Sequence, residues 1–191
     1  PYLGAQDEPI PGVHNSGAAA SPGREVVRDR SRWPDLERYT RDVVAHFRDD
    51  ARVLAWDLYN EPGHEAVFTR RVEPDPRGPL APQSVALAEA CFGWARDERP
   101  QQPLTSGVWS RDWATTEARL LELSDFVSFH NYFSLEPLAR QVEQLRNLGR
   151  PLVCTEWLAR SLGSLPETHL PYFAAERIGC FHWGLVNGRT Q

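Results

Sequence analysis

Short apolar runs alternate with stretches of helical periodicity along most of the chain, and this alternation limits the folds that are open to it. Apolar residues recur at helical spacing over residues 34–47, and residues 53–58 then form a short, mostly apolar run. Four further strands are predicted at residues 104–108, 126–130, 152–155 and 178–183. Short strands that alternate with helices indicate a parallel sheet built from βα units.

The same periodicity predicts the helices between these strands. They are expected at residues 83–96, 113–123, 138–149 and 167–176. Residues 1–33 hold several prolines and glycines and no apolar period, so they are predicted as an irregular segment. No glycine-rich phosphate-binding turn follows any predicted strand in the sequence, which disfavours the nucleotide-binding α/β folds.

The polar residues that could carry chemistry follow the C-terminal ends of the predicted strands. A (β/α)8 TIM barrel builds its active site at that rim, and its eight strands normally take about 250 residues. Five strands in 191 residues therefore predict an α/β fold that holds strands four to eight of a TIM barrel. On this interpretation residues 1–191 are the C-terminal part of one catalytic domain. Such a part has unpaired strand edges and is expected to be inactive or poorly folded alone.

Two of the predicted strands end in a glutamate. Glu61 follows the run at residues 53–58, and Glu156 follows the run at residues 152–155, so a closed barrel places both at one mouth. Cleavage of a glycosidic bond needs such a pair, because one carboxyl group protonates the leaving oxygen while the other carboxylate attacks the anomeric carbon or activates water. Either residue alone could be a helix-start or ion-pair glutamate; together they favour catalysis.

Four segments resemble the motifs of clan A glycoside hydrolases, and they look most like family 5 of that clan, the cellulase family. The Asn-Glu-Pro sequence at residues 60–62 resembles the acid/base motif, and the His-Asn-Tyr sequence at residues 130–132 resembles the sixth-strand motif. Glu156 resembles the nucleophile after the seventh strand, and Trp183 resembles the sugar platform after the eighth. The resemblance covers roughly residues 50–191 and implies a TIM barrel.

The resemblance also implies a reaction. Glu61 would be the general acid/base and Glu156 the nucleophile of a retaining, double-displacement hydrolysis of a β-linked glycan. The family also uses an arginine near the nucleophile on an early strand, and a polar residue at the end of strand three. Neither can be assigned in this sequence. No cofactor and no metal is expected, because the sequence holds no cluster of His and Asp ligands.

Four further positions match the family's substrate-binding residues, and the resemblance gives each of them a role. Asn60 would hydrogen-bond the 2-hydroxyl of the sugar at the cleavage point, and His130 would lie beside the acid/base. Tyr132 would donate a hydrogen bond to the nucleophile, and Trp183 would stack on a sugar face. Each residue taken singly could instead be a core or rim residue, so the prediction rests on the set.

Other aromatic and polar residues are more ambiguous. Trp109, Trp113 and Trp157 follow predicted strands and could line outer sugar subsites or pack in the core. His64 is predicted as a solvated loop histidine rather than a metal ligand, and residues 14–16 could reach the cleft from the early loop.

Charge and composition bear on nucleic-acid binding, on membrane insertion and on the state of the cysteines. The net charge of −5 disfavours a nucleic-acid-binding surface, which needs a basic face, and no apolar run approaches the roughly 20 residues of a membrane helix. The three cysteines are predicted as buried thiols, although a bridge between Cys154 and Cys180 is left open because their strands are expected to be neighbours. Localisation is not determined; a secreted or periplasmic site follows from the family resemblance only.

Three alternatives to an active glycosidase stay open. The chain could be a non-catalytic carbohydrate-binding barrel relative, an inactive fragment, or a metal-dependent barrel enzyme. The pair of glutamates argues against a purely binding role, because a binding cleft has no need of both. The sequence does not name the glycan, so cellulase, mannanase, xylanase and exo-acting glucosidase activities all remain open.

Overall fold

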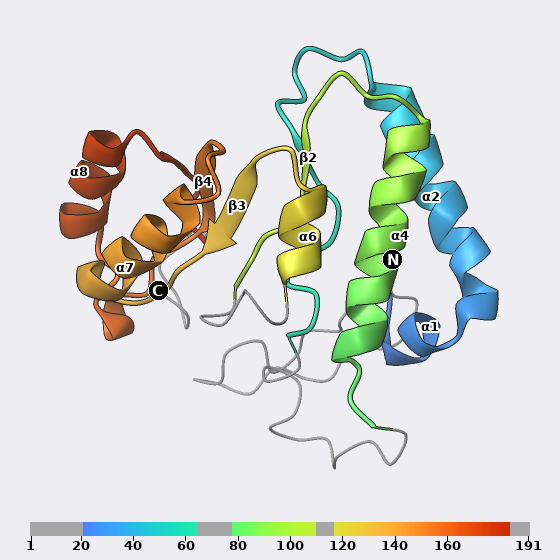
Figure 1. Ribbon diagram of the computed structural model, residues 1–191, viewed down its shortest axis with the longest axis horizontal. Helices are drawn as coiled ribbons and strands as arrows, with labels where there is room; N and C mark the ends of the chain where they lie inside the picture. The colour runs from blue at the N-terminus through green and yellow to red at the C-terminus, as the bar shows by residue number, and fades with distance from the viewer. Residues whose placement is uncertain (1–20, 65–77, 110–116, 184–191) are drawn as a thin grey trace. The chain divides into compact units, whose positions relative to one another are not determined.

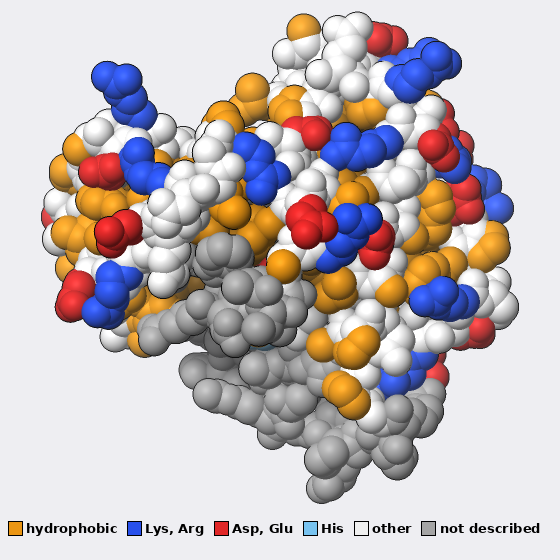
Figure 2. Space-filling view, in the orientation of Figure 1, with side chains coloured by type: hydrophobic (Ala, Val, Ile, Leu, Met, Phe, Trp, Pro, Cys, Tyr) orange, Lys and Arg blue, Asp and Glu red, His pale blue; other side chains and the backbone are white. Residues whose placement is uncertain are grey.

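A computed structural model describes residues 21–64, 78–109 and 117–183 (Figure 1). The chain divides into two compact units, one up to Pro103 and one from Leu104 onward, and each is described by itself. Within the described residues, no helix is both long enough and apolar enough to cross a membrane. On the face drawn in Figure 2, arginine and acidic side chains lie interspersed over the surface.

The first unit is mainly helical. Its elements are α1 (Arg24–Arg28), the 3-10 turn η1 (Arg30–Arg32), α2 (Trp33–Phe47), the short strand β1 (Trp56–Asp57) and α4 (Ala81–Asp97). A proline in the first turn starts both α2 and α4, where its missing N–H costs nothing. The buried positions of α4 recur at helical spacing: Ser84, Leu87, Ala88, Cys91, Phe92 and Ala95.

Helices α2 and α4 are held together by aromatic packing and by ion pairs. Trp33 and Trp94 meet edge to face with ring centroids 6.5 Å apart. Arg41 on α2 contacts Asp97 at 2.7 Å and Glu98 at 2.9 Å, so its guanidinium ties the two helices together (Figure 1).

The second unit is an α/β arrangement. Its elements are β2 (Leu104–Thr105), α6 (Ala118–Leu123), β3 (Val127–His130), α7 (Leu135–Arg146), β4 (Leu152–Glu156), η2 (Arg160–Leu162), α8 (Pro166–Glu176) and β5 (Gly179–Cys180). Strands β3, β4 and β5 form a parallel sheet in that order. Helices α7 and α8 lie side by side next to it, joined by an ion pair between Arg146 and Glu176 (Figure 1).

The core of the second unit lies between its sheet and the helices α7 and α8. All four residues of β3 are buried, and the sheet packs against Leu138, Val142 and Leu145 of α7 and against Phe173 of α8. All of β3 is buried, its polar residues Ser128 and His130 included, as expected of a parallel strand in a sheet of βα units. The parallel sheet of βα units that the sequence predicted is therefore confirmed for β3, β4 and β5.

Several predicted boundaries were wrong. The strands expected at residues 53–58, 104–108 and 178–183 are each only two residues long. The segment expected to be irregular up to residue 33 contains α1 and η1, and the Asp29 side chain accepts a hydrogen bond from the Ser31 N–H at the start of η1. Helix α7 ends at Arg146 rather than at Gly149, whose φ is +66°. The start of the helix expected at 113–123, and residues 14–16, lie outside the described residues.

The three cysteines are free thiols. Cys154 and Cys180 are register partners on β4 and β5, as the neighbouring-strand prediction expected, but they are not bridged. Burial raises the pKa of the Cys154 thiol, which favours the neutral, unreactive form.

Candidate active site

The ends of β3 and β4 are brought together by an irregular register. Phe129 lies opposite Cys154, but His130 lies opposite Glu156, so Thr155 is passed over. An extra residue of this kind is a β-bulge, and it reverses the alternation of side chains beyond it. Without the shift His130 would lie opposite Thr155. The bulge therefore sets Glu156 beside His130 at the C-terminal edge of the sheet.

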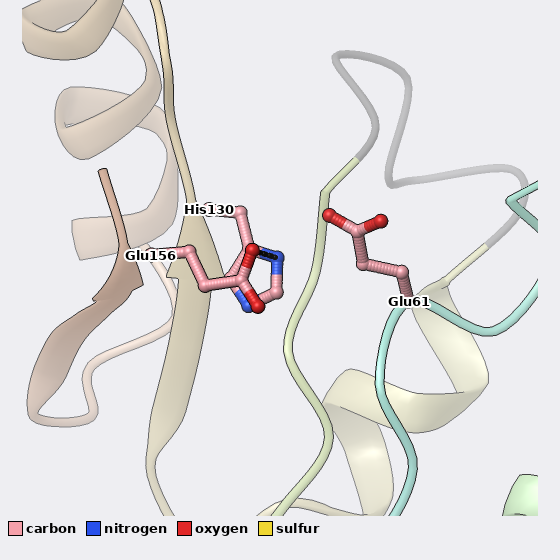
Figure 3. Close-up of side chains that lie close together, drawn as sticks. All are labelled: Glu61, His130 and Glu156. Carbon is pink, nitrogen blue, oxygen red and sulfur yellow. Dashed lines mark ion pairs between the residues drawn. The ribbon is translucent and has the colours of Figure 1, made fainter. Parts of the chain in front are cut away.

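Glu156 is held by two side chains from the segment that ends β3. The Tyr132 hydroxyl donates to Glu156 Oε2 at 2.6 Å. His130 Nδ1 lies 3.5 Å from the same oxygen, and Figure 3 marks this pair with a dashed line. The side chain of Glu156 is 17% exposed, so its carboxylate is sheltered yet reachable. A hydroxyl donor at this distance holds the Glu156 carboxyl group in one rotamer.

The His130 ring contacts Glu156 through Nδ1, and its other nitrogen, Nε2, lies close to the backbone at Gly107. The residue is only 4% exposed, and its backbone N–H donates to the Val108 carbonyl at 2.8 Å. A Cβ atom at Gly107 would stand 2.8 Å from His130 Nε2, closer than such contacts occur. A glycine at position 107 therefore makes the space in which the imidazole ring sits.

Asn131 orders the loop that carries Tyr132. Its backbone N–H donates to the Glu156 carbonyl at 3.0 Å, and its side-chain amide donates to Gln141 of α7 at 2.7 Å. Its side-chain oxygen accepts from the Phe133 N–H at 3.0 Å. Asn131 belongs to the His-Asn-Tyr motif, and the motif alone implies no role for it. In the structure, its hydrogen bonds connect the loop to β4 and α7.

Trp183 and Trp157 have different environments. Trp183 is 41% exposed, and its backbone N–H donates to the Trp157 carbonyl at 2.8 Å, which brings it close to the end of β4. Trp157 is 3% exposed and stacks on the buried His169 with centroids 5.7 Å apart. Of the two readings left open for Trp157, core packing is the one observed. Trp109 donates from its backbone to Glu117 at 2.9 Å, and Trp113 lies outside the described residues.

The first unit carries Asn60 and Glu61 on the turn after β1. Asn60 is exposed, whereas Glu61 is partly buried and has a positive φ of 46°. Pro62 and Gly63 follow, Gly63 with a φ of +85°, and the His64 N–H donates to the Glu61 carbonyl at 3.1 Å. Proline followed by a glycine of positive φ is the pattern of a type II turn, which returns the chain on itself.

The turn brings His64 onto Glu61. His64 Nδ1 lies 2.5 Å from Glu61 Oε2, and the two side chains are 19% and 17% exposed. The prediction of a solvated loop histidine was therefore wrong. The Pro-Gly pair was the sequence signal that could have found this contact, because it closes a turn with Glu61 and His64 at its two ends. Figure 3 labels Glu61 on the segment that follows β1.

The turn is anchored to α4 by one hydroxyl. The Gly63 N–H donates to Ser84 Oγ at 2.8 Å, and Ser84 Oγ donates in turn to the Ala81 carbonyl at 2.9 Å. Ser84 is 7% exposed, so this pair of hydrogen bonds is sheltered from water. The backbone around Glu61 is thus fixed to a helix rather than to a loose loop.

Within the second unit, Tyr132 and His130 hold the Glu156 carboxyl group in one orientation. The structure brings His130, Tyr132, Glu156 and Trp183 to one edge of that unit. Asn60 and Glu61 belong to the first unit.

The chain is similar to known proteins in fold, at low sequence identity. No protein-family model and no curated protein matches the sequence. Among solved structures, Bacteroides uniformis β-glucuronidase 2, covalently bound to cyclophellitol-6-carboxylate aziridine, is similar with a TM-score of 0.64 at 18% identity. That match covers 84% of this chain and 22% of the glucuronidase chain.

Two xylanases show the same likeness. The intracellular xylanase of Thermoanaerobacterium saccharolyticum has a TM-score of 0.57 at 15% identity, with 85% of this chain and 62% of that chain covered. A GH10 endoxylanase from a sugarcane soil metagenome has a TM-score of 0.54 at 13% identity, with 86% and 62% covered. The chain thus spans about a quarter of the length of the glucuronidases it resembles, and its fold is like part of their TIM barrel.

Proposed function

We propose that this chain carries the catalytic pair of a retaining β-glycosidase of clan A, with Glu61 as general acid/base and Glu156 as nucleophile. The observation that carries the proposal is the hydrogen bond from Tyr132 to Glu156 Oε2 at 2.6 Å, with His130 beside the same oxygen. A carboxylate that must attack carbon has to point in one direction, and a hydrogen bond from a hydroxyl donor holds it there.

The fold likeness supports the proposal at the level of the clan. The similar structures are β-glucuronidases and xylanases, which cleave glycosides by name, and both have a barrel of this kind. The sequence motifs looked most like family 5, which the likeness does not single out. Membership of family 5 therefore stays a prediction, as does the choice of glycan.

The reaction would run in two steps. Glu156 attacks the anomeric carbon as the glycosidic C–O bond breaks, and the Glu61 proton goes to the leaving oxygen. A water molecule then attacks the same carbon, Glu61 takes its proton, and the bond to Glu156 breaks to restore both carboxyl groups. Asn60, on the turn that carries Glu61, would hold the 2-hydroxyl, and Trp183 offers an exposed ring on which a sugar face could stack.

The test uses the complete protein that carries this sequence and a panel of aryl β-glycosides: glucosides, xylosides, mannosides and glucuronides. A Glu156→Gly variant should be inactive, and sodium azide should restore turnover by forming the α-glycosyl azide. A cyclophellitol aziridine of the matching sugar should label Glu156 in the wild type, and mass spectrometry of the peptides would locate the adduct. Full activity in Glu156→Gln would overturn the nucleophile assignment.

The same experiment distinguishes a glycosidase from a protein that only binds carbohydrate. A wild type that binds a glycan but turns over no glycoside on the panel, and takes no label at Glu156, would be a carbohydrate-binding relative. Loss of labelling in Glu156→Gln, with retained labelling in Glu176→Gln, would separate site chemistry from nonspecific alkylation, because Glu176 pairs with Arg146 away from the sheet edge.

A further inference from the structure

We infer that His64 is a positioning residue for Glu61: its imidazole donates a hydrogen bond from Nδ1 to Glu61 Oε2 and holds the acid/base carboxyl group in one orientation through both steps of the reaction. The inference rests on the proposed role of Glu61. Its basis is the contact of 2.5 Å between His64 Nδ1 and Glu61 Oε2, with both side chains more than four-fifths covered.

The backbone supports this contact from three directions. The turn over residues 61–64 is closed by the hydrogen bond from the His64 N–H to the Glu61 carbonyl. Gly63 allows the positive φ that the turn requires, and a Cβ there would meet only Ala81 and Val85 at 3.8 Å. Ser84 fixes the Gly63 N–H to α4. His64 therefore returns to Glu61 from a fixed backbone and not by chance rotation of a loop.

One protonation state of His64 serves both steps. While Glu61 is an acid with its proton on Oε1, Oε2 is a carbonyl oxygen and accepts a hydrogen bond. After the proton has left, Oε2 belongs to a carboxylate and accepts more strongly. A neutral imidazole with its proton on Nδ1 can donate to Oε2 in either state. His64 need not exchange a proton in the reaction, and its contribution is the direction in which the Glu61 carboxyl group points.

The chemistry of the leaving group gives a measurement that a purely structural residue would not affect. A 2,4-dinitrophenolate leaves without protonation, whereas a phenolate or an alkoxide needs a proton from the acid. The value of kcat/KM reports the first irreversible step, in which Glu61 acts as the acid. The ratio of kcat/KM for a phenyl and a 2,4-dinitrophenyl glycoside of the same sugar is also independent of the fraction of protein that is folded.

The substitutions are matched in shape. Asparagine at position 64 places an N–H donor near the position of Nδ1, and leucine has the same branching without a donor. In the complete protein, His64→Leu should lower kcat/KM for the phenyl glycoside about 10–100-fold and change that for the dinitrophenyl glycoside by less than about threefold. His64→Asn should recover most of the loss. His46→Asn, on the exposed side of α2, should leave both substrates unchanged.

The outcomes separate this inference from the proposed function. Equal losses on the two substrates in His64→Leu, or no loss at all, would overturn the role of His64 while Glu61→Ala still showed the dependence on the leaving group. If Glu61→Ala showed no such dependence, the assignment of Glu61 would fail, and the inference about His64 would fall with it. Failure of His64→Asn to recover activity would rule out a hydrogen-bond donor as the basis of the effect.

Discussion

The hydroxyl of Tyr132 donates to Glu156 Oε2 at 2.6 Å and links the loop after β3 to the last residue of β4. The contact depends on the bulge that passes over Thr155, because the bulge turns Glu156 to the side on which His130 and Tyr132 lie. Irregular registers are common beside active sites, where they aim a side chain that a regular ladder would point elsewhere.

Tyr132→Phe should keep the fold and lower the activity. Phenylalanine fills almost the same volume, so the change removes only the donor to Glu156. A hydrogen bond to a charged group contributes about 1.5–3 kcal/mol, which corresponds to a loss of about 10–100-fold in kcat. Steady-state kinetics and a circular dichroism melt would be measured together. An unchanged kcat would mean that Glu156 does not depend on Tyr132.

Gly107→Ala should disturb His130. The new Cβ would stand 2.8 Å from His130 Nε2, so the ring must tilt, and its Nδ1 must move relative to Glu156. We expect a loss of activity that exceeds any loss of stability. Gly93→Ala is the matched control: among the described residues, no atom lies within 4 Å of a Cβ placed at position 93 on α4, and the change should stabilise the protein by about 0.5–1 kcal/mol. Equal activity in the two variants would contradict the prediction.

Ser84→Ala should loosen the turn that carries Glu61. The change leaves the Gly63 N–H without its acceptor and should cost about 1–3 kcal/mol of unfolding free energy. Ser124→Ala removes a comparably buried hydroxyl, which donates to the Leu120 carbonyl at the end of α6. Urea unfolding should therefore show losses in both variants. Only Ser84→Ala should also lower kcat/KM for glycosides with poor leaving groups.

The stability of the first unit should fall at alkaline pH. Burial raises the pKa of Cys91 to about 11, and a hydrogen bond with Thr40 only partly opposes this. The unfolded thiol ionises near pH 9, so unfolding releases a proton between pH 9 and about 11, and the folded state loses its advantage as the pH rises through that window. The stabilisation present below pH 9 is on the order of 2–3 kcal/mol.

The same behaviour is expected of Tyr59, whose pKa burial raises to about 12. Urea unfolding at pH 8 and pH 11 would measure the loss. Cys91→Ala should show a smaller difference between the two pH values than the wild type, although its stability at pH 8 is lower because of the cavity. A difference as large as that of the wild type would show that Cys91 is not the group responsible.

Much of the fold could be predicted from local pattern. The helices that became α2, α4, α7 and α8 were located to within a few residues, because their apolar residues repeat with a helical period. The strands β3 and β4 could be located because each coincides with a short, largely apolar run, at residues 126–130 and 152–155. The strands at residues 53–58, 104–108 and 178–183 were predicted too long, because an apolar run does not show where pairing stops.

The sequence by itself determined which residues could carry the chemistry. Glu156, His130 and Tyr132 follow strands of a parallel sheet, and the order of those strands already indicated that their side chains share an edge. It also contained the Pro-Gly pair of the turn that joins Glu61 to His64.

Only the tertiary structure decided which atoms meet. A bulge at Thr155 depends on how β3 and β4 settle against each other and against α7, and no local pattern encodes that shift of one residue. The space beside His130 depends on a glycine that lies 23 positions earlier in the sequence. Residue types are a property of the chain, whereas the direction of a carboxylate is set by contacts between distant segments, and those exist only in the folded state.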